Sequence, residues 1–194
     1  MKKSIFSIIG VLFLASFMFV ACEETEGVAD PYTDWEARNQ AYIDSIAEVA
    51  KNNPSEWKII HTWKFNESLG DLNSDVNDYV YCKVLESGNG TQPLFTNTVS
   101  VNYRGWLIPL YDGSIEIFDQ SYMGQLNRDV AKPVDFALNS EVLRVGWSTA
   151  LMQMKVGDRW EVYIPADLAY GDLGQSSIPG FSTLIFDIDL VKVY

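Results

Sequence analysis

One short segment, Val145–Leu151, constrains the fold of this chain more than any other part of its sequence. It has the pattern of a seven-residue helix, and the turn Lys155–Asp158 follows it. A helix of this length is not stable in water by itself, so other elements must cover it. The segments on either side alternate apolar and polar residues with period two, which predicts strands. We therefore expect an α+β fold, a curved antiparallel sheet wrapped around one short helix, with Trp147 at its centre.

The apolar positions of the predicted strands define the inner face of this sheet. They are Val99, Val101 and Tyr103, then Trp160, Val162 and Ile164, and finally Leu184, Phe186, Ile188 and Leu190. Asp187 and Asp189 share the opposite face, where they could be imagined as the paired carboxylates of a glycosidase. We interpret them instead as a solvent-exposed strand face.

The beginning of the chain resembles an export signal. A basic start, the apolar run Ile5–Val20 and small Ala21 before Cys22 predict a lipoprotein signal peptide over residues 1–21, with lipid on Cys22. The alternative is a retained membrane anchor, although the run falls just short of the ~20 residues that span a bilayer. Residues 22–33 are predicted to be an acidic tether.

Residues 34–90 predict an N-terminal extension that packs on the main domain, which we place at residues 91–194. The extension begins with a helix whose apolar residues form one stripe: Trp35, Tyr42, Ile43, Ile46 and Val49. This stripe could pack on its own domain or pair with a second copy. An extended segment from Trp57 to Phe65 and a strand over Asp78–Leu85 are expected to follow.

Composition excludes several classes of function. The net charge of −12 at pH 7 argues against nucleic acid, because phosphate binding needs a basic patch. Cys22 and Cys82 are the only cysteines, so no disulfide is expected, and Cys82 alternates with apolar residues like a buried, inert thiol. A single histidine, His61, supports neither a metal cluster nor a catalytic triad. We therefore expect no metal and no cofactor.

Several short motifs follow one another between Thr98 and Val193. They are Val101–Gly105, Phe118–Asp119, Val145–Trp147, Met154–Arg159, Ile164–Pro165, Leu168–Gly171, Ile178–Pro179 and Thr183–Asp187. In residues and in order, these motifs resemble the FKBP family, the macrolide-binding peptidyl-prolyl cis-trans isomerases. By spacing alone, the aromatic residues in them could simply form a core.

The resemblance implies a role for each matching residue. Trp147 would be the floor on which a proline ring rests, with Phe186, Phe118 and Tyr103 as walls and Ile178 as a cover. Tyr170 would donate a hydrogen bond to a substrate carbonyl, and Asp119 would be held near the twisting amide or would cap a turn. We take Tyr103, Asp119 and Tyr170 as the catalytic candidates.

The chain also departs from the family pattern. Val134 stands where the family often has a third phenylalanine, which makes one wall smaller. Leu143 and Arg144 stand where an apolar pair is usual, which places a charge at the rim of the site. The segment Gln120–Ala131 is longer than in the smallest members and could be an added flap.

The resemblance implies a prolyl isomerase that acts on exported or unfolded proteins without covalent chemistry, with a macrolide as a possible ligand. The alternative is a chaperone or assembly module of the cell envelope that binds proline segments without turnover. A structural surface lipoprotein, with an occluded pocket, is a third interpretation. Lipid on Cys22 would hold the protein at the envelope of a Gram-negative bacterium, at its outer membrane.

Overall fold

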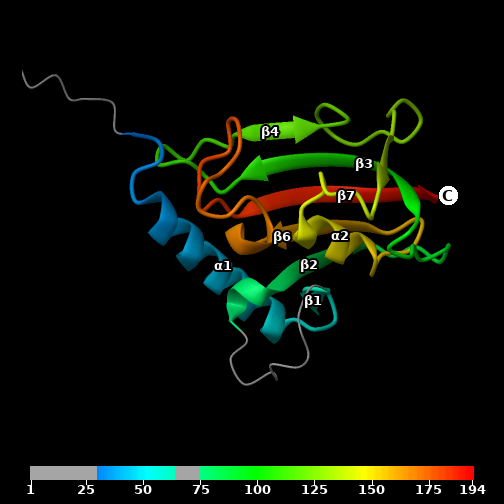
Figure 1. Ribbon diagram of the computed structural model, residues 1–194, viewed down its shortest axis with the longest axis horizontal. Coiled ribbons are helices and arrows are strands. Elements are labelled where there is room, and N and C mark those ends of the chain that lie inside the picture. The colour runs from blue at the N-terminus through cyan, green and yellow to red at the C-terminus, as the bar shows by residue number, and fades with distance from the viewer. Residues whose placement is uncertain (1–29, 64–74) are drawn as a thin grey trace, which may run out of the picture.

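The computed structural model describes residues 30–63 and 75–194, which form one antiparallel sheet with two α-helices (Figure 1). The predicted signal peptide, Cys22, most of the tether, and Phe65 lie outside the described residues. In chain order the elements are α1 (Trp35–Asn52), β1 (Trp57–His61), the 3₁₀ turn η3 (Val76–Asp78), β2 (Tyr79–Glu86), β3 (Thr98–Leu107), β4 (Ile117–Gln120), β5 (Val134–Ala137), α2 (Val145–Leu151), β6 (Arg159–Ile164), the 3₁₀ turn η4 (Ala166–Leu168) and β7 (Leu184–Val193). Among the described residues, no helix is long and apolar enough to cross a membrane.

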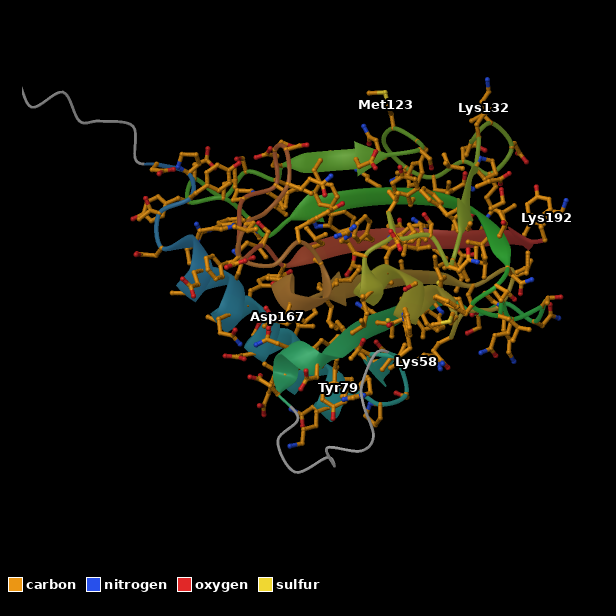
Figure 2. All side chains as sticks on the ribbon, in the orientation of Figure 1. Lys58, Tyr79, Met123, Lys132, Asp167 and Lys192 are labelled. Atoms are coloured by element: carbon orange, nitrogen blue, oxygen red, sulfur yellow. The ribbon has the colours of Figure 1, made fainter. Side chains whose placement is uncertain are left out.

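The strand order of the sheet is β1-β2-β6-β7-β3-β4, and β5 also pairs with β3. The long strands β3 and β7 run side by side through the middle, with Tyr103 opposite Ile188. β4 and β5 pair with different parts of the other edge of β3. The connection between them extends outward from the body, as Met123 and Lys132 show in Figure 2, and Met123 is 84% exposed.

The N-terminal extension contributes strands to this sheet. β2 pairs with β6, with Cys82 opposite Val162, and β1 pairs with the other edge of β2. The strand expected over Asp78–Leu85 is found at Tyr79–Glu86. Cys82 is fully buried, and this burial raises the pKa of its thiol. The sheet therefore continues across the boundary predicted at residue 91.

The short helix α2 packs on one face of the sheet, as the period-two pattern predicted. Its residues from Gly146 to Leu151 are all buried, and so are the inward residues of β3, β6 and β7. A Cβ on Gly146 would lie 2.3 Å from the side chain of Ile164. The missing side chain at this position therefore allows the helix to sit directly on β6.

The helix α1 packs on its own domain. Trp35, Ile43 and Ala50 are buried, and the indole N–H of Trp35 donates to the hydroxyl of Ser182 at 2.9 Å. The side chain of buried Asn39 accepts a hydrogen bond from the backbone N–H of Thr183 at 2.7 Å. These contacts tie the extension to the segment that leads into β7.

The prediction that Asp187 and Asp189 form a solvent-exposed face is wrong. Asp189 is 2% exposed and accepts hydrogen bonds from Arg128 at 2.7 Å and from Asn102 at 3.0 Å. Asp187 accepts two hydrogen bonds from Arg159, at 2.9 and 2.6 Å. The reason is that Arg128, in the connection between β4 and β5, reaches back over this face and forms an ion pair with Asp189.

Candidate functional site

A cavity of about 270 Å³ opens between the inner face of the sheet, the start of α2 and the loop before β7. Its lining contains nine of the ten positions predicted for the pocket: Tyr103, Phe118, Asp119, Leu143, Arg144, Trp147, Tyr170, Ile178 and Phe186. These residues come from β3, β4, α2, β7 and two connecting segments, one between β5 and α2 and one between η4 and β7. The fold thus gathers residues that lie far apart in the sequence.

The floor of the cavity is a set of aromatic rings that pack edge to face. The Trp147 ring lies edge-on to three others, with centroid distances of 5.9 Å to Tyr103, 4.8 Å to Phe136 and 6.0 Å to Phe186. Phe118 meets Phe186 in the same way at 5.4 Å. Edge-to-face packing is the favoured geometry of aromatic pairs, so each ring holds the orientation of its neighbours.

The indole N–H of Trp147 is buried and has no hydrogen-bond partner among the described residues. A buried donor without a partner is costly, and such donors are rare in folded proteins. The floor of the cavity therefore combines an apolar surface with an unused donor.

Tyr103 and Asp119 form a hydrogen-bonded pair at one wall. The Tyr103 hydroxyl donates to the Asp119 carboxylate at 2.8 Å. Burial, together with this hydrogen bond, raises the pKa of the Tyr103 phenol above its usual value. The phenol therefore stays protonated at neutral pH. Asp119 thus accepts a hydrogen bond from another residue of the cavity lining.

Tyr170 also lines the cavity and lies in the segment after η4. Within the described residues its hydroxyl has no hydrogen-bond partner, and the guanidinium carbon of Arg144 lies 5.1 Å from the centre of its ring. Ile178 is buried and closes the cavity from the loop before β7, where its backbone exchanges two 2.9 Å hydrogen bonds with Gln175. Gly174 precedes this turn with φ +68°, and a Cβ there would lie 2.3 Å from the Ile178 carbonyl oxygen.

Val134 is the pocket position that the structure places outside the cavity, and its side chain is 39% exposed. The wall expected there is supplied by Phe136, two residues further along β5. Residues two apart on a strand share a face, so the alternation pattern alone predicts that Phe136 faces the same side of β5 as Val134. The lining residues that the sequence analysis did not predict for the pocket are Phe136, Val142, Ile164, Gln175, Ser176, Ser177 and Leu184; of these, Ile164 and Leu184 were predicted only as inner-face positions of strands.

The described residues that line the cavity include no histidine and no cysteine. His61 lies at the end of β1 against Tyr79, at a ring distance of 4.8 Å, and does not line the cavity. Over residues 30–63 and 75–194, no group of three or more His, Cys, Asp or Glu side chains could hold a metal ion. The site offers an apolar recess for a ring, with the hydroxyl of Tyr170 beside it.

Sequence comparison assigns this combination of fold and pocket to a family. The model of the FKBP-type peptidyl-prolyl cis-trans isomerases matches residues 90–191, which is more than half of the chain. The chain therefore belongs to this family, and the resemblance seen in the motifs is confirmed.

Individual relatives support the assignment. The FKBP-type 22 kDa peptidyl-prolyl cis-trans isomerase of Escherichia coli (strain K12) is 39% identical over 112 residues, 57% of this chain and 48% of that protein. The outer membrane protein MIP of Legionella longbeachae is 38% identical over 112 residues, 57% of this chain and 42% of that protein. The chain thus spans about half the length of the curated relatives that it matches.

A solved structure agrees over a larger part of the chain. The peptidyl-prolyl cis-trans isomerase of Pseudomonas syringae pv. tomato is 28% identical, with a TM-score of 0.58, over 86% of this chain and 98% of the other. The shared fold therefore includes part of the N-terminal extension as well as the matched domain.

Proposed function

We propose that this protein catalyses the cis–trans isomerisation of X-Pro bonds in exported or unfolded polypeptides. The observation that carries the proposal is the Trp147 floor, enclosed by aromatic rings and open to a ligand beside Tyr170. Its family membership and the names of its relatives support the same activity.

The reaction needs no nucleophile. Rotation about an X-Pro bond has a barrier of roughly 18–20 kcal/mol, because the planar amide must lose its resonance. The twisted amide has less charge separation than the planar one, so an apolar cavity favours the twisted state relative to water. An acceleration of about 10⁴-fold requires only about 5.5 kcal/mol of such preference.

The polar groups orient the substrate in this proposal. The prolyl ring rests on Trp147, and the free hydroxyl of Tyr170 donates to a substrate carbonyl. The Tyr103 hydroxyl is directed to Asp119 at 2.8 Å, which holds the carboxylate at the wall of the cavity, near the twisting amide. Ile178 covers the bound segment from above. None of these groups transfers a proton.

The test is an isomerisation assay on short X-Pro peptides, with the wild type and a Trp147→Ala/Tyr170→Phe double variant. We expect the wild type to accelerate cis-to-trans conversion and the double variant to lose most of this acceleration. Unchanged activity in the double variant would remove the catalytic assignment. A macrolide should compete with the peptides, since we propose that it occupies the same cavity.

A second candidate is a module that binds proline segments without turnover. Arg144 favours it, because a charge replaces an apolar residue at the rim of the cavity. This candidate predicts peptide binding and suppressed aggregation of unfolded proteins, with no change in the isomerisation rate. The same peptide panel, measured for both binding and rate, separates the two candidates.

We also propose that the protein is a lipoprotein of the Gram-negative cell envelope, anchored at the outer membrane through Cys22. The pattern of residues 1–22 and the name of the Legionella longbeachae relative support this location. A Cys22→Ala variant should no longer incorporate labelled palmitate or sediment with membranes; sedimentation like the wild type would contradict the anchor. Pairing of two copies through α1 stays a prediction, for which Val49, 42% exposed, is still available.

A further inference from the structure

Arg144 is the only cationic side chain among the residues that line the cavity. It precedes the first residue of α2 and is partly buried. Its Nη2 donates to the carbonyl oxygens of Glu141 at 3.1 Å and Val142 at 3.2 Å, while its plane covers the Tyr170 ring. These contacts hold the guanidinium at the mouth of the cavity.

The charge of Arg144 is not neutralised by the described residues. Arg128 and Arg159 each pair with carboxylates, whereas Arg38 and Arg104, like Arg144, donate to backbone carbonyl oxygens and form no ion pair among the described residues. No carboxylate of the described residues lies within ion-pair distance of Arg144, and its Nε is buried without a hydrogen-bond partner. Asp119, the carboxylate in the same lining, is already bound by Tyr103.

The Nη1 of Arg144 donates to no acceptor among the described residues, so it can form a charge-assisted hydrogen bond with the carboxylate of a ligand. Arg144 and Trp147 line the same cavity of about 270 Å³, so a segment whose prolyl ring rests on Trp147 passes close to Arg144. A carboxylate that reaches Arg144 must therefore come from a residue next to the proline.

We propose that Arg144 makes this site selective for proline segments with an aspartate or glutamate adjacent to the proline. This inference rests on the proposed isomerase function and adds the substrate class to it. A lysine at the same place would meet a like charge at the mouth of the cavity. Because the guanidinium is only partly buried, the preference is modest, about fivefold in kcat/KM for Glu over Ala, and it weakens with salt.

The experiment uses peptides with Ala, Glu or Lys immediately before or after the proline, at low salt and at 0.5 M NaCl. For the wild type we expect kcat/KM to rise in the order Lys, Ala, Glu at one of the two positions. Arg144→Gln should abolish the order, and Arg144→Glu should invert it. Arg104→Gln is the matched control, because Arg104 follows Tyr103 on β3, points to the other face of the sheet and should leave the order unchanged.

The outcomes separate this inference from the proposed function. Equal acceleration of the Ala, Glu and Lys peptides would overturn the role of Arg144 while leaving the isomerase intact. If no peptide is accelerated, the isomerase proposal fails, and the dissociation constants of the same peptides then test the charge preference. A Glu peptide that binds no more tightly than a Lys peptide would overturn the inference in that case.

Discussion

Gly105 sets the spacing of two walls of the cavity. It lies on β3 opposite Phe186, and a Cβ there would come within 2.6 Å of the Phe186 ring and 2.7 Å of the Phe118 ring. Carbon atoms pack best at about 3.5–4.0 Å, so Gly105→Ala must displace the rings by roughly 1 Å. Overpacking lowers the free energy of unfolding by about 1–3 kcal/mol. Replacing glycine by alanine also makes the unfolded chain less flexible, which offsets about 0.4–1 kcal/mol of this loss. We expect the free energy of unfolding to fall by about 1–2 kcal/mol.

The displaced rings should also narrow the cavity, so activity should fall more than the loss of stability explains. The assays are urea unfolding and kcat/KM on an Ala-Pro peptide. Val101→Ala is the matched control, because Val101 is buried on the same strand outside the cavity lining and its truncation costs about 2 kcal/mol. Gly105→Ala should lose at least about tenfold in kcat/KM, equivalent to about 1.4 kcal/mol, while Val101→Ala keeps wild-type activity. Equal activity of the two variants would refute the reasoning.

Three further predictions concern stability, measured by urea unfolding. Asp158→Ala should cost about 3 kcal/mol, because this buried carboxylate accepts two backbone N–H groups at 2.6 Å; a loss below about 1 kcal/mol would contradict this. Burial raises the pKa of Tyr81 from 10.0 to about 12, so the native state keeps a proton that the unfolded chain releases. The contribution of Tyr81 to the free energy of unfolding should therefore be fully present below pH 10 and be lost as the pH rises toward 12. In Tyr81→Phe the free energy of unfolding should fall less steeply over this pH range, and a slope identical to that of the wild type would exclude Tyr81 as a cause. Arg128→Met should lower the free energy of unfolding by about 2 kcal/mol, because it leaves buried Asp189 without its ion pair. Adding Asp189→Asn to this variant should restore most of the lost stability, and a double variant as unstable as Arg128→Met would contradict an electrostatic cause.

The core of the fold could be predicted because its signals are local. The bounds expected for the short helix, Val145–Leu151, are those of α2. The period-two pattern identified the inner face of β3, β6 and β7, and the buried residues confirm it. Motif order then brought nine lining residues of the cavity together without any knowledge of strand pairing.

The parts of the fold that the sequence did not predict depend on contacts between segments that are distant in sequence. Nothing near Asp189 reveals that Arg128, 61 residues away, will cover it, so the face was predicted to be exposed. Likewise, β2 joins β6 through a register that no local pattern encodes. Phe136 was overlooked for another reason: comparison with a family pattern directed attention to Val134, although alternation places both on one face of β5.

The central claim is that the aromatic cavity lowers the barrier to twisting a prolyl amide. Exchange NMR on one Ala-Pro peptide, with a substoichiometric amount of the full chain, measures this directly. We expect cis–trans exchange cross-peaks to appear with the wild type and to disappear when Trp147 is replaced by alanine. A peptide that shifts the indole resonance of Trp147, and so occupies the cavity, yet exchanges no faster than in buffer would contradict it.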